Sequence, residues 1–294
     1  MERLKGAIII GFLRVFSLLP FAMAQRLGAA VGWLLWILPN RSKDVVRINL
    51  SHCMPHLAAG ERDDLVRQTL LDTGRSFAES ACAWMWKPAK TVALIKEVEG
   101  AQVLQKALER GKGVVSITSH LGNWEVLNHW YCSQCSPVIF YRPPKQQSVD
   151  ALLRRQRAQL GNRVAPSTRE GITMVMREVR RGGAVGIPAD PEPAVKSGEF
   201  VPFFAVSALT SKFVPNLLRG GEAQAIFMHC VRLPGGGFKV IVEAAPEALY
   251  SSDVNEATAC MSAVIESYVR RWPSQYMWSM KRFKKRPAGE KRWY

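Results

Sequence analysis

Cysteine is scarce in this chain, at six residues in 294, which is too few for a disulfide-rich scaffold. Only Cys132 and Cys135 form a Cys-x-x-Cys pair, and no second pair or histidine follows at a spacing typical of a zinc site. We interpret the cysteines as core or surface thiols and expect neither a metal nor a cofactor. This usage fits a reducing compartment that faces the cytoplasm.

Acidic residues are also few, at 24 against 40 Lys and Arg, which leaves a net charge of +16. Charged residues at 22% and a mean hydropathy near zero exclude a disordered composition. Glycine and proline are present at ordinary levels, which excludes collagen-like and low-complexity sequence. The positive charge predicts an anionic partner, which could be nucleic acid, an anionic membrane surface or an acidic substrate.

The N-terminal region has few charges of either sign, because only Arg14 and Arg26 interrupt the apolar stretch 6–38. We predict that residues 1–40 form a membrane-anchoring segment whose helix spans the bilayer or lies in its interface. A cleaved signal peptide fits less well because the apolar run resumes after Arg26, and a buried core helix is the remaining alternative. The basic residues that follow favour a cytoplasmic main body: Arg41, Lys43 and Arg47.

Residues 41–294 contain helical and strand patterns in alternation, with no internal repeat and no linker. Strands are predicted at 114–118, 137–141, 184–187, 223–231 and 238–243, and helices at 60–86, 101–109, 121–131, 148–160, 170–181, 210–218 and 253–271. The polar stretch 190–202 predicts a loop. The alternation predicts a single layered α/β domain with a largely parallel central sheet flanked by helices.

The segment SHLGNWE (119–125) carries the strongest candidate chemistry. His120 follows the predicted strand 114–118, at the carboxyl end where open α/β sheets bind ligands. Histidine suits a general base at neutral pH, and a carboxylate such as Glu125 can hold its other ring nitrogen. The alternative is a structural histidine that caps the following helix.

A nucleophile for covalent catalysis is missing from the sequence. The motif Gly-x-Ser-x-Gly is absent, and Ser119 points to the opposite face from His120 if both lie on a strand. We therefore favour direct transfer, in which His120 activates a substrate hydroxyl.

HLGNWE resembles the His-x4-Asp/Glu signature of glycerolipid acyltransferases. Further blocks resemble, in the same order, those of the lipid A late acyltransferases, the lauroyl and myristoyl transferases of Gram-negative bacteria: NLSHCMP (49–55), DTGRSFAE (72–79), YRPPK (141–145), EFVPFFAVSALTSK (199–212) and QYMWSMKRFKKRPAGE (275–290). Two positions depart from that pattern. Met54 replaces an aromatic residue, and Glu192 replaces the second Asp of an Asp-x-Asp loop.

The resemblance implies an inner-membrane enzyme, with its site facing the cytoplasm, in the fold class of glycerolipid acyltransferases. It would move a fatty acyl chain from acyl carrier protein, the co-substrate, to a hydroxyl on a hydroxyacyl chain of a lipid A precursor. His120 would be the base and Glu125 its orienting carboxylate. Because both substrates carry anionic groups, four cations are expected to bind them: Arg142, Lys145, Arg163 and Arg169. Asp190, in the loop that resembles the family's Asp-x-Asp, is also expected to bind substrate. Arg142 is expected nearest the reacting centre, and a solvated surface base is the alternative for each cation.

The C-terminal stretch 281–294 is strongly basic and carries aromatic residues among its lysines and arginines. Beside a membrane segment, this pattern predicts contact with anionic membrane lipid through Trp278, Phe283, Trp293 and Tyr294. The block VPFFAV (201–206) is either a buried strand or a wall for an acyl chain. Two other functions remain open: a phospholipid or lysophospholipid acyltransferase with the same chemistry, and a membrane-attached nucleic-acid-binding protein. We expect no nucleic acid partner, because no known binding motif is present.

Overall fold

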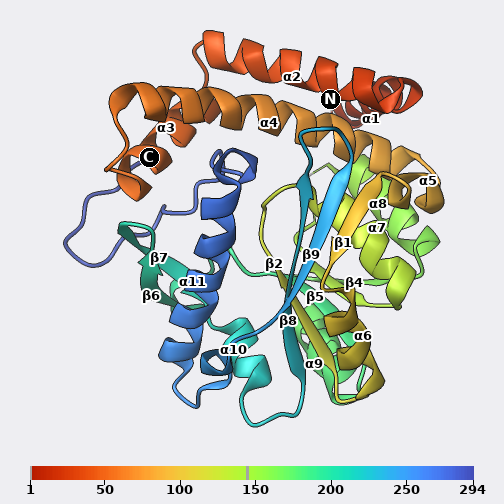
Figure 1. Ribbon diagram of the computed structural model, residues 1–294, viewed down its shortest axis with the longest axis vertical. Helices are drawn as coiled ribbons and strands as arrows, with labels where there is room; N and C mark the ends of the chain where they lie inside the picture. Colours follow the sequence, from red (N-terminus) through yellow and green to blue (C-terminus); the bar gives the residue numbers. More distant parts are fainter. Residues whose placement is uncertain (1, 144–145) are drawn as a thin grey trace.

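The centre of the molecule is a seven-stranded sheet flanked by helices (Figure 1). We describe it from a computed structural model that covers residues 2–143 and 146–294. The strand order is β1 (Ile95–Glu99), β9 (Phe238–Ala244), β8 (Gln224–Arg232), β2 (Val114–Thr118), β5 (Ala184–Pro188), β3 (Val138–Tyr141) and β4 (Arg163–Pro166). Neighbouring strands are parallel except for β8 and β9. The predicted α/β class with a largely parallel sheet is confirmed.

The two faces of the sheet bury different side chains, as the alternation of a strand requires. On β2, Val114 packs into a cluster with residues of α6 (Ala101–Glu109) and α7 (Trp124–Gln134). Val115 and Ile117 point the other way, into the larger cluster that includes α9 (Arg169–Arg180) and α11 (Val254–Arg271). Because β2 is buried on both faces, its sequence VVSIT is mostly β-branched and lacks a regular apolar–polar alternation.

The remaining helices are α1 (Glu2–Leu18), α2 (Phe21–Ile37), α3 (Arg41–Cys53), α4 (Ala59–Met85), α5 (Pro88–Val92), α8 (Gln147–Gln159) and α10 (Phe213–Leu218). Short 3-10 turns lie at Val195–Ser197, Glu247–Tyr250 and Pro273–Gln275. The long helix predicted over 60–86 is confirmed as α4, and the helix predicted over 101–109 as α6. Asp253 caps α11 by accepting a hydrogen bond from the backbone N–H of Asn255.

The loop predicted over 190–202 is wrong in its second half. There β6 (Gly198–Phe203) forms an antiparallel hairpin with β7 (Val206–Ser211), and α10 begins only at Phe213 rather than at residue 210. Pro202 made β6 hard to predict, because proline is found in a sheet only on an edge strand. In a two-stranded ribbon both strands are edge strands, so Pro202 is tolerated there. Val201 and Phe203 of β6 are buried, whereas Pro202 is exposed and Phe204 lies in the turn after the strand.

The single N-terminal membrane helix that the sequence predicts is replaced by α1 and α2, which lie across α4 (Figure 1). Pro20 separates them, because proline lacks a backbone N–H and disfavours helical geometry in the preceding residue. Among the described residues, no single helix has the length and apolar character to cross a membrane. Only α2 and α3 together meet that criterion, and they are bent by 78° relative to each other.

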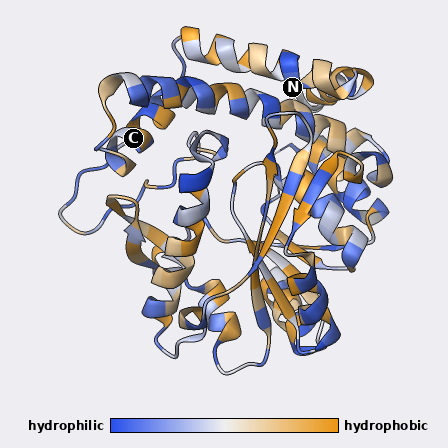
Figure 2. Ribbon diagram, in the orientation of Figure 1, coloured by the Kyte–Doolittle hydropathy of each residue, from blue (hydrophilic) through white to orange (hydrophobic). Residues whose placement is uncertain are grey.

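Helix α2 packs unusually close to α4 at glycine positions. A Cβ on Gly74 would lie 2.0 Å from the carbonyl oxygen of Gly28, and one on Gly32 would lie 2.3 Å from that of Leu70. Only glycine permits this backbone contact. The outward faces of α1 and α2 expose large apolar residues, seen as hydrophobic segments in Figure 2: Phe12, Val15, Leu18, Met23, Leu27, Val31, Trp33, Leu34 and Ile37.

The C-terminal stretch folds back onto α3, and two of the four aromatic residues predicted to contact a membrane lie in the core. Trp278 and Phe283 are buried in the larger core cluster, and the Trp293 ring stacks on His52 at 3.9 Å between ring centroids. The hydroxyl of Tyr294 donates to the side-chain oxygen of Asn49. The predicted surface role of Trp278 and Phe283 is therefore wrong, because these rings fill the core.

Candidate active site

The pairing of two central strands brings His120 and Asp190 together. Thr118 at the end of β2 pairs with Pro188 at the end of β5, so the residues two positions further on become neighbours. Nδ1 of His120 lies 3.0 Å from Oδ1 of Asp190, and the backbone N–H of His120 also donates to both carboxylate oxygens. The hydroxyl of Tyr276 donates to Oδ2 at 3.1 Å. The carboxylate is thus fully engaged and fully buried.

This pair shifts the protonation of both partners. Burial opposes ionisation of Asp190, but the charge and hydrogen bonds of His120 outweigh burial, so the pKa of Asp190 lies below its ordinary value. Burial likewise lowers the pKa of His120, but the charge and hydrogen bond of Asp190 raise it more, and the net shift is upward. Among the described residues Nε2 of His120 has no hydrogen-bond partner, which leaves it available as a base.

The residues GNWE (122–125) form the turn after His120 and the start of α7. Gly122 has φ +66°, and a Cβ there would lie 2.0 Å from the carbonyl oxygen of Cys230 on β8. Asn123 caps α7, because its side-chain oxygen accepts from the backbone N–H groups of Glu125 and Val126. The ring of Trp124 packs edge-on against His120 at 4.9 Å between centroids. The turn therefore fixes His120 between β2 and the start of α7.

Glu125 does not occupy the position that the sequence predicts for it. Its carboxylate pairs with Arg157 of α8, with 3.2 Å between Oε1 and Nη2, and among the described residues it makes no hydrogen bond to His120. The carboxylate on Nδ1 is Asp190, which the sequence analysis assigned to substrate binding and which is instead enclosed by protein groups. Arg157 is buried beside Glu125 and was missed, because nothing in its helix marks it as functional.

A deep cavity of about 430 Å³ opens at His120. Glu125, Arg142 and Arg157 line it together with His120, so the structure brings Arg142 to the site as predicted by its position after β3. The other walls are mainly apolar: Leu127, Tyr131, Ile139, Phe140, Leu153 and Met228. This combination of an apolar cavity with a few polar groups is typical of a small-molecule or lipid-chain site.

Two of the predicted cations lie elsewhere. Arg163 and Arg169 line a separate surface hollow of about 530 Å³ with Arg177 and Arg181, and none of the four lines the cavity at His120. Arg163 pairs with Glu178 at 2.6 Å. Lys145, the last predicted cation, lies outside the described residues.

A buried Ser119–His229 pair was also missed by the sequence analysis. The Ser119 hydroxyl lies 2.9 Å from Nε2 of His229, and Ser119 lines the same cavity as His120 rather than an opposite face. Burial lowers the pKa of His229 to about 3, so this ring is neutral at all working pH values. Among the described residues Nδ1 of His229 has no partner, so the pair lacks the orienting group of a serine nucleophile.

A buried ion-pair cluster supports the turn from behind. Arg232 donates to Glu79 at 2.6 Å and to Asp72 at 2.9 Å, and Glu79 also accepts from the side chain of Asn123. Gln25 of α2 donates to the same Glu79 at 2.7 Å. The cap of α7 is therefore hydrogen-bonded, through Glu79, to both α4 and α2.

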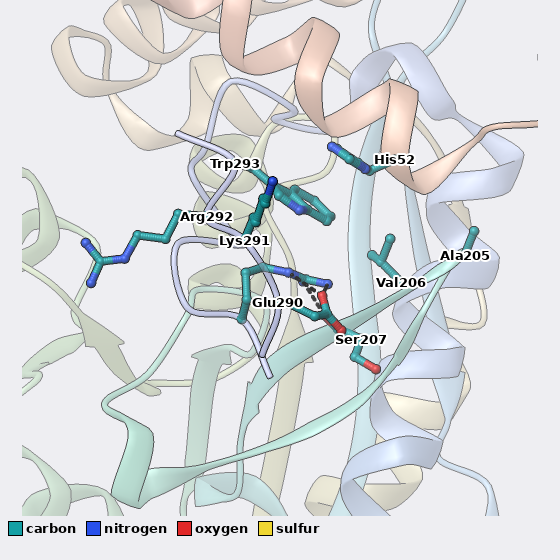
Figure 3. Close-up of a pocket in the computed structure, with 9 residues that line it drawn as sticks. His52, Ala205, Val206, Ser207, Glu290, Lys291, Arg292 and Trp293 are labelled. Carbon is teal, nitrogen blue, oxygen red and sulfur yellow. Dashed lines mark hydrogen bonds and ion pairs between the residues drawn. The ribbon is translucent and has the colours of Figure 1, made fainter. Parts of the chain in front are cut away.

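A broad hollow of about 700 Å³ at the C-terminus is polar and separate from this site (Figure 3). Its walls include His52, Glu290 and Trp293, and none of its lining residues lines the cavity at His120. Arg286 donates there to Glu290 and to the backbone oxygen of Ser207. Arg286 and Glu290 therefore neutralise each other, and we assign no chemistry to this hollow.

The fold and the site together define a class: an α/β protein with a buried histidine–aspartate pair beside a mainly apolar cavity. The family model for bacterial lipid A biosynthesis acyltransferases matches residues 3–285, so the chain belongs to that family. It is therefore an acyltransferase of lipid A, and hence lipopolysaccharide, biosynthesis.

Individual relatives support this over nearly the full length. The chain is 28% identical to the lipid A biosynthesis palmitoleoyltransferase of Escherichia coli (strain K12), over 97% of this chain and 92% of that protein. It is also 28% identical to the lauroyltransferase of the same organism, over 95% and 91%. The myristoyltransferase is 22% identical over 83% and 75%. Because these names specify three acyl groups, the similarity does not select one.

Proposed function

We propose that this enzyme transfers a fatty acyl chain from acyl carrier protein to the hydroxyl of a hydroxyacyl chain on a lipid A precursor. The observation that carries the proposal is His120, paired with the buried Asp190, in the wall of the apolar cavity, in a chain of this family. The cavity would take the donor acyl chain, whose thioester carbonyl would then lie beside Nε2 of His120.

The reaction needs one proton carrier. Nε2 of His120 takes the proton of the acceptor hydroxyl as its oxygen bonds to the thioester carbon, and Asp190 stabilises the imidazolium that forms. The carbon–sulfur bond then breaks, and the proton passes from His120 to the departing thiolate. Arg142, at the same opening, is placed to stabilise the oxyanion or a substrate phosphate.

We propose that the hollow on α9 receives the acidic carrier protein. Arg169 and Arg177 lie two turns apart on one helix, and Arg181 and Arg163 adjoin them. Ile172 and Met176 are partly exposed on the same helix. A basic surface with apolar residues among its charges suits an acidic helical partner.

We further propose that the enzyme lies on the bacterial inner membrane with its catalytic domain on the cytoplasmic side. The exposed apolar faces of α1 and α2 support attachment without a spanning helix. Arg14 and Arg26 are exposed on these helices and can extend to anionic lipid headgroups.

The direct test uses purified enzyme, acyl carrier protein loaded with chains of defined length, and either a lipid A precursor or glycerol phosphate. We expect acylation of the lipid A precursor, detected by mass spectrometry as an ester on a hydroxyacyl chain. Transfer to glycerol phosphate alone would instead favour the phospholipid acyltransferase alternative. Use of acyl coenzyme A in place of the loaded carrier protein would refute the proposed donor.

Asp190→Asn is expected to move the acid limb of the pH–rate profile to lower pH. The base must be neutral, so the rate rises with pH through the pKa of His120, which Asp190 holds above its ordinary value. Without the charge of Asp190 the pKa of His120 falls, and the acid limb of the profile moves to lower pH by the same amount. The kcat on the plateau of the profile also falls. The loss is at most roughly 10²–10⁴-fold, which is the usual contribution of general-base catalysis.

Glu125→Gln is the comparison for this experiment. The charge of Glu125 also raises the pKa of His120, but it is the smallest of the contributions, so its removal should shift the limb less. A larger shift in Glu125→Gln than in Asp190→Asn would reinstate Glu125 as the orienting carboxylate.

A further inference from the structure

A second, smaller hollow reaches His120 next to the deep cavity. It encloses about 200 Å³, and it shares His120 and Trp124 with the larger cavity. Its other walls come from α4, from the turn after His120 and from the segment before the C-terminal stretch: Thr73, Ser76, Phe77, Ser80, Trp84, Gly122 and Ser274 to Met277. Its lining surface is mainly apolar. Two apolar sites therefore meet at one histidine.

The proposed reaction brings two alkyl chains to that point. The donor chain leads away from the carbonyl carbon, and the acceptor chain continues beyond the carbon that bears the hydroxyl. A single cavity would have to hold both chains side by side, whereas two adjoining apolar sites would hold them apart. A small acceptor such as glycerol phosphate would need no second apolar site.

We propose that the smaller hollow binds the alkyl part of the acceptor hydroxyacyl chain, an inference that rests on the proposed function. The deep cavity would then hold the donor chain. Trp124 lies against His120 and lines both sites, so its ring separates the two chains.

The surroundings of each site agree with this division. Phe77, which is 47% exposed at the small hollow, contacts Phe16 of α1 edge-to-face at 5.9 Å. The small hollow thus adjoins the N-terminal helices that expose apolar surface, where a membrane lipid would approach. The larger cavity is lined by β3 and α8, where the exposed Arg142 can meet an anionic, water-soluble donor.

The test changes acceptor chain length and donor chain length independently. Ser80→Phe fills the small hollow from α4. The ratio of kcat/KM for a long-chain hydroxyacyl acceptor over a short-chain analogue should fall about tenfold, because roughly two methylene groups lose their burial. Phe77→Ala removes an outer wall at a half-exposed position and should lower the same ratio. The donor chain-length profile should stay as in the wild type in both variants.

Ser267→Phe is the matched control, because it makes the same substitution at an exposed position of α11 outside both sites. If the wild type acylates no hydroxyacyl acceptor, the proposed function fails. If the wild type does so but both variants keep the acceptor ratio, the inference alone is overturned. A shifted donor profile in Ser80→Phe would also overturn it, since the small hollow would then hold the donor. If Ser80→Phe fails to fold, Phe77→Ala decides the outcome.

Discussion

Replacing His120 with glutamine is expected to lower kcat about 10²–10⁴-fold, the usual contribution of a general base. Glutamine keeps a polar group in the turn but cannot accept and return a proton. Binding of both substrates depends on other groups, so KM should change much less than kcat. The measurement is steady-state transfer to the lipid A precursor, with circular dichroism to verify folding.

His56→Gln is the matched control, since His56 is exposed and lines neither apolar site. Its kinetics should equal those of the wild type. If folded His120→Gln enzyme turned over as fast as this control, His120 would not be the base. The buried Ser119–His229 pair would then be the next candidate for the chemistry.

Arg232→Ala is expected to cost about 3–5 kcal/mol of folding free energy, because it leaves a buried carboxylate without its charge partner. Glu79 is fully buried, and its pKa lies below the ordinary value because the charge and hydrogen bonds of Arg232 outweigh the effect of burial. In the variant the effect of burial is no longer offset by Arg232, so the pKa of Glu79 rises. The deficit should therefore grow as pH rises above the ordinary Glu value of 4.5.

Urea unfolding at several pH values measures this deficit. Lys112→Ala is the control, because Lys112 and Glu222 form an exposed pair, and such pairs contribute about 0–1 kcal/mol. Equal unfolding midpoints for the two variants would show that the buried cluster adds no more than a surface pair.

The residues that the sequence placed correctly are those whose signals are local. His120 follows a short β-branched run, and Arg142 follows another, so their positions at strand ends could be predicted from neighbours in the chain. Asp190 could not be paired with His120 in this way. Their contact depends on the pairing of β2 with β5, which are 70 residues apart, and no local pattern encodes that register.

The errors share a physical origin, which is that nearby spacing was given more weight than tertiary context. Glu125 lies close to His120 in sequence, but the capped first turn of α7 directs its carboxylate to Arg157 on another helix. The aromatic residues of the C-terminal stretch look like a membrane signal, yet Trp278 and Phe283 fill a core formed by distant elements. Pro20 was visible in the sequence, and it divides the N-terminal segment into two helices.

The glycine contact between α2 and α4 has a practical consequence for anyone who wants a truncated, water-soluble form of this enzyme. Deleting residues 1–40 would uncover the backbone around Gly74, and it would remove the Gln25 side chain that binds Glu79. Glu79 in turn holds Asn123, the cap of the helix that follows the His120 turn. The N-terminal helices therefore support the His120 turn through Glu79, and solubility is better sought by substituting their outward apolar side chains than by removing them.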